Sequence, residues 1–168
     1  NNGDVWASSE TEIYKLDKET FVPLGLHNKL PLKKLLIADM SFVNGQVWFI
    51  ANFSDIILLQ PETDNDYSLL FFSKEFRGGK YLSDARIIHQ SDSNTVWIGS
   101  RSEGLIKINI AAKTFINAGA AGTNSSLSRQ FILSFFTNRQ KITWIGLSGG
   151  GIAKYDIQKV QFGLWRNE

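Results

Sequence analysis

The sequence repeats one short phrase four times, and this repetition limits the possible fold more than any other feature. Each copy places a tryptophan inside an apolar run and follows it, several residues later, with a second apolar run. The tryptophans are Trp6, Trp48, Trp97 and Trp144, which lie 42, 49 and 47 residues apart. Self-similarity with a period of about 40–50 residues is typical of arrays of supersecondary units, which bury their apolar faces against one another.

Within each repeat the apolar residues form short segments separated by turn residues, which indicates strands and leaves no room for a long helix. The connections are short and rich in Asn, Asp, Gly and Ser, as in antiparallel meanders. The third repeat predicts strands at residues 85–89, 95–100, 105–109 and 114–117. The fourth repeat predicts strands at residues 131–136, 143–147, 152–155 and 160–165.

Repeated four-stranded meanders of this size are the blades of a β-propeller. The sequence therefore predicts an all-β fold, a partial propeller over residues 1–168, with blades at approximately 1–26, 32–76, 82–118 and 127–165. The first of these four blades lacks its innermost strand. A β-sandwich would not need the same phrase four times, although strand spacing alone does not exclude it. Uncovered blade faces are prone to association, so we expect a larger propeller or a partnership with another copy of the chain.

Composition narrows the class of protein. A hydrophobic fraction of 43% with 12% aromatic residues predicts a folded core. The formal net charge is +2 and the basic residues are scattered, which argues against a nucleic-acid partner. The longest apolar runs, such as residues 69–72, are far shorter than the roughly 20 residues that span a bilayer, so no membrane span is expected within this chain.

The chain contains no cysteine, which excludes disulfides and thiolate chemistry and is compatible with a reducing or an oxidising compartment. It begins at Asn1 rather than Met, and we therefore expect a processed or excised piece of a longer protein.

The repeated phrase is most complete in the third and fourth repeats. The fourth combines Trp144-Ile145-Gly146 with Gly149-Gly150-Gly151 and Tyr155-Asp156, and the third combines Trp97-Ile98-Gly99 with Gly104-Leu105. These residues resemble the two-component regulator propeller repeat. The first two repeats keep the tryptophan but have Ala7-Ser8 and Phe49-Ile50 in place of the Ile-Gly that follows it.

This resemblance implies a location and a function. Repeats of this kind occur in the periplasmic sensor region of hybrid two-component system histidine kinases, which are inner-membrane proteins. They build large propellers that respond to ligands, often oligosaccharides released during glycan breakdown. The resemblance therefore implies a sensing module that is not itself an enzyme, with any histidine kinase outside this chain.

A candidate ligand site follows from the expected fold. In a propeller, the loops between second and third strands emerge on the same face as the loops that join consecutive blades, and such loops commonly carry function. That face would gather Asn52, Asp55, Tyr81, Arg101, Glu103 and Asn124. Planar hydrogen-bonding groups and one aromatic ring suit a polyhydroxylated ligand. Ordinary solvated loops are the alternative interpretation of the same residues.

The tryptophans could themselves stack on sugar rings, but their equivalent positions favour packing between blades. Gly99 and Gly146, which follow two of them, are expected to permit close approach of neighbouring sheets.

Other patterns predict no catalytic residue, no cofactor and no metal site. Residues 149–151 join two predicted strands, and residues 77–80 lack the flanking residues of a phosphate loop. Asp64, Asp66, Ser68 and Glu75 have the spacing of calcium-loop positions 1, 3, 5 and 12, but Leu69 stands at position 6, where glycine is required. The two histidines, His27 and His89, have no partners at metal-ligand spacing.

Two alternatives to ligand sensing remain open. The first is a protein-interaction propeller without a small-molecule ligand. The second is a propeller enzyme such as a polysaccharide lyase or glycosidase. We rank it last because the sequence places no pair of carboxylates across a channel.

Overall fold

The computed structural model describes residues 4–30, 35–43, 45–63, 66–72, 82–118, 127, 130–149, 151–156 and 161–165. These residues form four antiparallel sheets and one short helix, α1 (Leu26–Lys29). Sheet I contains β1 (Trp6–Ser8), β2 (Ile13–Asp17) and β3 (Thr20–Pro23). Sheet II contains β4 (Ile37–Val43), β5 (Gln46–Ala51), β6 (Asp55–Thr63) and β7 (Asp66–Phe71).

Sheet III contains β8 (Ala85–Gln90), β9 (Thr95–Ser100), β10 (Gly104–Asn109) and β11 (Thr114–Asn117). Sheet IV contains β12 (Ile132–Thr137), β13 (Ile142–Leu147), β14 (Ile152–Asp156) and β15 (Gln161–Trp165). The strands expected in the third and fourth repeats are confirmed to within one residue at each end. In every sheet the strands are paired in the order in which they occur along the chain, as in a meander.

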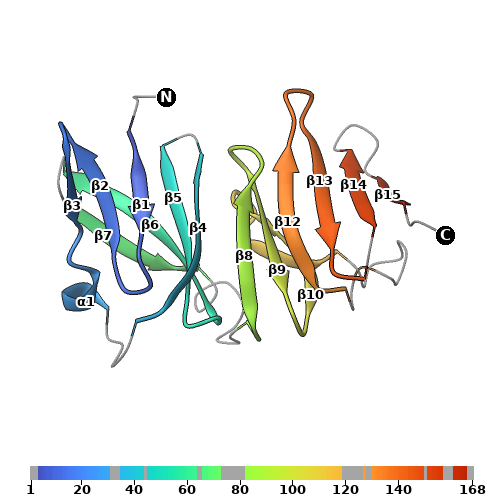
Figure 1. Ribbon diagram of the computed structural model, residues 1–168, viewed down its shortest axis with the longest axis horizontal. Helices are drawn as coiled ribbons and strands as arrows, with labels where there is room; N and C mark the ends of the chain where they lie inside the picture. Colours follow the sequence, from blue (N-terminus) through green and yellow to red (C-terminus); the bar gives the residue numbers. More distant parts are fainter. Residues whose placement is uncertain are drawn as a thin grey trace.

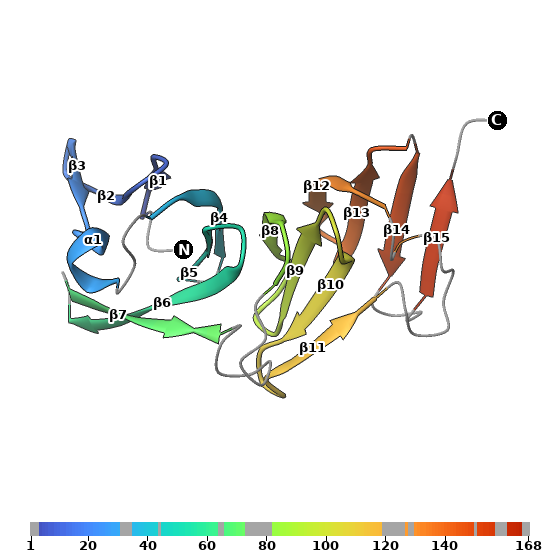
Figure 2. The ribbon, with the colours of Figure 1, turned by 90° about the horizontal axis from the view of Figure 1, so that it is seen from below.

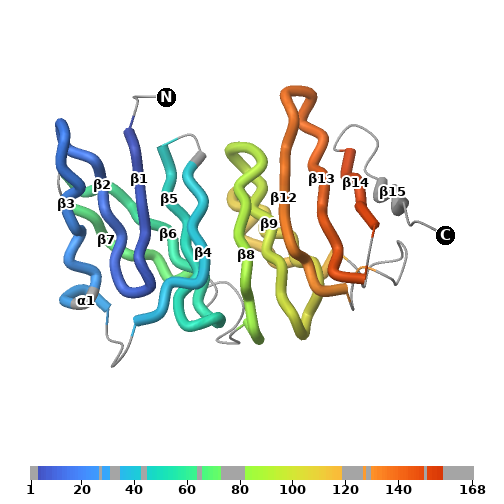
Figure 3. Tube along the Cα trace, in the orientation of Figure 1, coloured from blue at the N-terminus to red at the C-terminus, as the bar shows by residue number. Residues whose placement is uncertain are grey.

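The four sheets follow one another in a row, with sheet I at one end and sheet IV at the other (Figure 1). The first strands of neighbouring sheets contact each other, β1 with β4, β4 with β8, and β8 with β12. The turned view shows the later strands of each sheet leading away from this shared edge (Figure 2). The Cα trace shows the same succession of meanders (Figure 3). The described sheets form an open row of propeller-type blades, as the repeats predicted.

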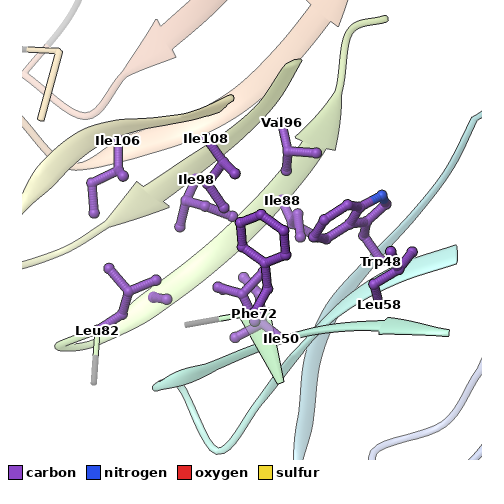
Figure 4. Close-up of a cluster of buried hydrophobic side chains, with 12 residues drawn as sticks. Trp48, Ile50, Leu58, Phe72, Leu82, Ile88, Val96, Ile98, Ile106 and Ile108 are labelled. Carbon is purple, nitrogen blue, oxygen red and sulfur yellow. The ribbon is translucent and has the colours of Figure 1, made fainter. Parts of the chain in front are cut away.

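The core consists of three apolar layers, one between each pair of neighbouring sheets. In β5, Phe49 packs in the layer shared with sheet I, whereas Trp48 and Ile50 pack in the layer shared with sheet III (Figure 4). The inner sheets are therefore buried on both faces. In sheet IV, burial alternates along β13, because within the described structure only one face of this sheet is packed against another sheet.

Three of the four tryptophans pack in these layers. Trp48 and Trp97 are fully buried, and they pack edge-on against Phe72 and Tyr155 with ring centroids 5.2 and 4.8 Å apart. Packing between sheets, rather than sugar stacking, is thus confirmed as the role of these two side chains. Trp6 packs against Phe42 and Tyr67 in the layer between sheets I and II and is partly buried. Trp144 is also partly buried, and it lies on the face of sheet IV that no described sheet covers.

Side chains of β4 accept hydrogen bonds from backbone amides of β8 and so join the first strands of sheets II and III. The Asp39 carboxylate accepts from the Ile88 amide at 2.8 Å, and the Ser41 hydroxyl accepts from the Gln90 amide at 3.0 Å. Between sheets III and IV, the His89 ring stacks on Phe135 and its Nε2 lies 2.8 Å from the Thr137 hydroxyl. Burial raises the pKa of Asp39 and lowers the pKa of His89, because desolvation disfavours the charged form of each group.

Candidate functional site

A tight turn between β5 and β6 holds the backbone in an unusual conformation. The Ser54 amide donates to the Ala51 carbonyl at 3.1 Å, and both central residues, Asn52 and Phe53, have positive φ of 51° and 59°. This is a type I′ geometry, in which glycine normally takes the second central position. For a residue as bulky as Phe53 the left-handed conformation costs roughly 1–2 kcal/mol. Such strain is commonly found at functional positions.

The Phe53 ring has a specific neighbour that accounts for its position. The guanidinium carbon of Arg86, on β8 of sheet III, lies 4.0 Å from the ring centroid, which is a close cation–π contact. Arg86 Nε also donates to the Asp84 carboxylate at 2.6 Å. The Phe53 carbonyl accepts from the Ala85 amide at 2.7 Å, so backbone and ring together connect this turn to the start of β8.

Asp84 extends the arrangement toward sheet IV. It too has a positive φ, 52°, and its carbonyl accepts from the Arg101 amide at 3.0 Å. Its carboxylate lies 4.0 Å from Arg101 Nε, and the Arg101 guanidinium lies 5.1 Å from the centroid of the Phe131 ring. Phe131 immediately precedes β12. Two rings with three charged groups between them therefore connect three sheets, in the order Phe53, Arg86, Asp84, Arg101 and Phe131. We call these five residues the aromatic–arginine row.

The turn between β9 and β10 is fixed to the same segment by side-chain hydrogen bonds. Glu103 Oε1 accepts from the Ser83 amide at 2.9 Å, while the Ser100 and Ser102 hydroxyls donate to the Ser83 carbonyl at 2.5 and 2.7 Å. Residues 82–85 are thus bonded to the β5–β6 turn and to the β9–β10 turn. The hydrogen-bonded backbone of both turns places the row at one end of the sheets.

The structure brings together four of the six residues that the sequence indicated. Asn52 and Asp55 lie in and beside the first turn, Arg101 and Glu103 lie in the second, and residues 82–85 connect the two turns. Tyr81 and Asn124 lie outside the described residues.

The four side chains differ in what they leave available to a ligand. The Asn52 amide oxygen accepts from the Leu36 amide at 2.9 Å, and Asp55 is 94% buried, with Ser54 donating to its carboxylate at 3.2 Å. Glu103 is bonded to Ser83 as described above. Arg101 is 62% exposed and its only ion pair among the described residues is the long one with Asp84. Arg101 is therefore the member of the four that is best placed to contact a ligand.

Sequence reasoning missed Phe53, Asp84, Arg86 and Phe131. A signal for Phe53 was present, because an aromatic residue directly follows Asn52 in a turn of the length that favours Asn-Gly. Arg86 and Phe131 are recognisable only from contacts between sheets, and Asp84 only from the pairing of β8 with β9, which no spacing along the chain reveals.

The described charged groups of this end of the sheets nearly balance. Arg86 and Arg101 share the Asp84 carboxylate, and Asp55 and Glu103 add two further carboxylates, so these described residues carry no excess of positive charge for a phosphate or another strong anion. Among the described residues, no group of three or more His, Cys, Asp or Glu side chains could hold a metal ion. The arrangement instead offers flat rings, planar donors and carboxylate acceptors, the groups that bind hydroxyl-rich, uncharged molecules.

The described part of the chain contains no helix with the length and apolarity needed to cross a membrane.

The fold is that of β-propeller domains of known structure. The chain is similar to the extracellular domain of BT4673 from B. thetaiotaomicron, described as a hybrid two-component system, with a TM-score of 0.64, 14% identity, and coverage of 98% of this chain and 21% of that one. It is similar to the corresponding domain of BT3049 from the same organism, with a TM-score of 0.59, 20% identity, and coverage of 98% and 20%. YCF48 bound to D1 peptide has a TM-score of 0.61, 8% identity, and coverage of 98% and 52%.

The chain thus spans about a fifth of the length of the two sensor domains and about half of YCF48. No protein-family model matches the sequence, and no curated protein matches it.

Proposed function

We propose that this chain is part of the ligand-sensing propeller of an extracytoplasmic receptor of the hybrid two-component type, located in the periplasm, and that it binds uncharged oligosaccharides. The observation that carries the proposal is the aromatic–arginine row, found at the loop end of a fold shared with the extracellular domains of two such receptors. A phosphorelay function would belong to other parts of the receptor, and we assign no catalytic role to this chain.

The row supports ligand binding through its chemistry. The rings of Phe53 and Phe131 offer apolar faces of the kind that stack on pyranose rings, and Arg101 offers guanidinium donors for hydroxyl oxygens. Because the positive and negative groups nearly balance, a neutral ligand would not leave a buried charge without compensation.

The row also supports signalling through its position. Its members come from sheets II, III and IV, so a ligand lying along it would contact three sheets at once. A ligand that prefers one relative arrangement of these sheets shifts the population toward that arrangement. A change in blade geometry is the form of output that we propose for this module.

A thermal-shift screen against neutral oligosaccharides tests the proposal. Binding at about one hundred times Kd adds about 2.7 kcal/mol, which corresponds to a rise in Tm of roughly 5–10 °C for a chain of this size. We expect Arg101→Ala and Phe53→Leu to reduce the rise. Phe21→Leu is the matched control, because it removes a ring that is 46% exposed on β3, away from the row. No rise with any oligosaccharide, or equal rises in all variants, would contradict the proposal.

A peptide ligand is the second candidate, and the likeness to YCF48, whose structure was determined with a D1 peptide, favours it. If the oligosaccharide screen is flat, capture of a partner that Arg101→Ala fails to capture would support the peptide function.

A further inference from the structure

A cavity of about 360 Å³ opens between sheets I and II, at the end of the sheets opposite the aromatic–arginine row. Its position follows from chain direction, since Asp17 ends β2 and Tyr67 lies at the start of β7, far along both strands from the β5–β6 turn. The volume lies within the range of small-molecule sites. The wall consists of Asp4, Lys15, Leu16, Asp17, Val22, Pro23, Leu24 and Tyr67.

Lys15 is the cation of this cavity, and its ammonium group is loosely bonded. Its Nζ lies 3.5 Å from a carboxylate oxygen of Asp4, 3.5 Å from the Tyr67 hydroxyl, and 5.6 Å from the centroid of Trp6. Both polar distances are at the outer limit for hydrogen bonds. Because an ammonium group has three N–H donors, Lys15 retains capacity to donate to an anionic group in the cavity.

The two carboxylates outnumber this cation. Trp6 pairs with Lys15 across β1 and β2, and the Leu16 amide donates to the Val5 carbonyl, so continuing the register brings Asp4 opposite Asp17. Like charges opposite each other on neighbouring strands are destabilising. Lys15 is ion-paired with Asp4, whereas the Asp17 side chain makes no hydrogen bond or ion pair with another described residue. The cavity therefore has one carboxylate that a cation from outside could bind.

The interface between sheets III and IV provides an internal comparison. There Lys107 pairs with Trp97 across β9 and β10, as Lys15 pairs with Trp6, and its Nζ lies only 3.0 Å from the Tyr155 hydroxyl. Trp97 is fully buried and Tyr155 is 7% exposed, so this arrangement is closed. The position equivalent to Asp17 is Asn109, whose side chain accepts from the Ala112 amide at 2.8 Å within its own turn.

Between sheets I and II, the tyrosine that contacts the lysine comes from a different strand than it does between sheets III and IV. Tyr155 comes from the third strand of sheet IV, whereas Tyr67 comes from β7, the outer strand of sheet II. The Tyr67 ring is buried in the layer between sheets I and II, and its hydroxyl meets Lys15 at the wall of the cavity. Opposite charges and an aliphatic wall thus line the same accessible space.

We propose that this cavity binds a small zwitterion of the amino-acid type. Asp17 receives the ammonium group, Lys15 and the Tyr67 hydroxyl donate to the carboxylate, and Val22, Pro23 and Leu24 contact the aliphatic body. The proposal is independent of the oligosaccharide function, because the two sites lie at opposite ends of the sheets.

Amide NMR titration of the protein with three matched probes tests this inference. L-Leucine carries both charges, isoamylamine carries only the ammonium group, and 4-methylpentanoate carries only the carboxylate. We expect saturable shifts with L-leucine, concentrated at Lys15, Asp17, Val22, Leu24 and Tyr67, and affinities about tenfold weaker for each singly charged probe.

Substitutions of Asp17 and Lys15 test separately the two charged side chains that would bind the zwitterion. We expect Asp17→Asn and Lys15→Gln each to weaken L-leucine binding about tenfold, whereas Glu19→Gln, which removes an exposed carboxylate from the same hairpin outside the cavity, leaves it unchanged. Asp17 is exposed, so its variant should fold normally. No saturable shifts with L-leucine, equal binding of isoamylamine, or full binding by Asp17→Asn would overturn the proposal. Shifts confined to Phe53, Arg86 and Arg101 would overturn it as well, without bearing on the oligosaccharide site.

Discussion

Gly99 is the position at which the spacing of two sheets depends most directly on one residue. A Cβ atom added to Gly99 on β9 would lie 2.5 Å from Ile87 Cγ2 and 2.7 Å from Ile132 Cβ. The Ile87 methyl group can move by side-chain rotation. Ile132 Cβ is fixed to the backbone of β12, so sheet IV would have to move away by roughly 1 Å to restore an ordinary carbon–carbon contact of about 3.5–4.0 Å.

That movement gives the expected size of the effect. Overpacking in a core costs about 1–3 kcal/mol, and we expect Gly99→Ala to fall in the upper half of this range because it also loosens the layer that contains Trp97 and Tyr155. Gly146→Ala is the matched control. Its added Cβ would meet only the Ser134 hydroxyl at 2.5 Å, with the next atoms at 3.7 Å or beyond, and this hydroxyl can rotate away.

Urea unfolding of the wild type and the two variants measures both effects. We expect the free energy of unfolding to fall by about 2–3 kcal/mol in Gly99→Ala and by less than about 1 kcal/mol in Gly146→Ala. A loss of less than about 0.5 kcal/mol in Gly99→Ala, or equal losses in both variants, would refute the argument that Gly99 sets the distance between sheets III and IV.

Three further predictions concern charged and polar contacts between sheets. Burial lowers the pKa of His89, so its contribution to stability is complete above about pH 6.5 and is lost as pH falls through the lower pKa of the folded state. The urea midpoint of the wild type should therefore fall on acidification, and it should fall less steeply in His89→Gln. Identical slopes in the two proteins would contradict this prediction. Burial raises the pKa of Asp39, so its contribution to stability is largest below pH 3.8 and is lost as pH rises through the pKa of the folded state. Asp39→Asn should raise the urea midpoint at neutral pH, because the asparagine oxygen can still accept from the Ile88 amide. A lower midpoint would show that ionised Asp39 is favoured. A double-mutant cycle on Lys107→Met and Tyr155→Phe should give a coupling free energy of about 1 kcal/mol, and zero coupling would remove the energetic role of their 3.0 Å contact.

The sequence was sufficient to predict the sheets because local rules agree with the fold throughout the repeats. The period of the tryptophan phrase, the short apolar segments and the turn residues all indicate meanders, and Trp48 and Trp97 pack between sheets as expected. Gly99 likewise allows Ile132 of the next sheet to approach closely.

The candidate sites were predicted less completely because they depend on distances between sheets. Asn52 has the polarity of a ligand-binding residue, but its amide oxygen is bonded to the Leu36 backbone. The strain at Phe53 is a property of φ, and the contacts of Arg86 with Phe53 and of Arg101 with Phe131 arise only when neighbouring sheets are packed. The proposed zwitterion cavity likewise depends on Tyr67 reaching across from the outer strand of sheet II.

The most direct test of the sensing proposal is hydrogen–deuterium exchange with and without the neutral oligosaccharide that raises Tm most. The aromatic–arginine row predicts that protection is concentrated in residues 51–55, 82–86 and 100–104, the three segments that the hydrogen bonds join. Protection that is absent from these segments, or that appears only around Lys15 and Tyr67, would contradict the proposal.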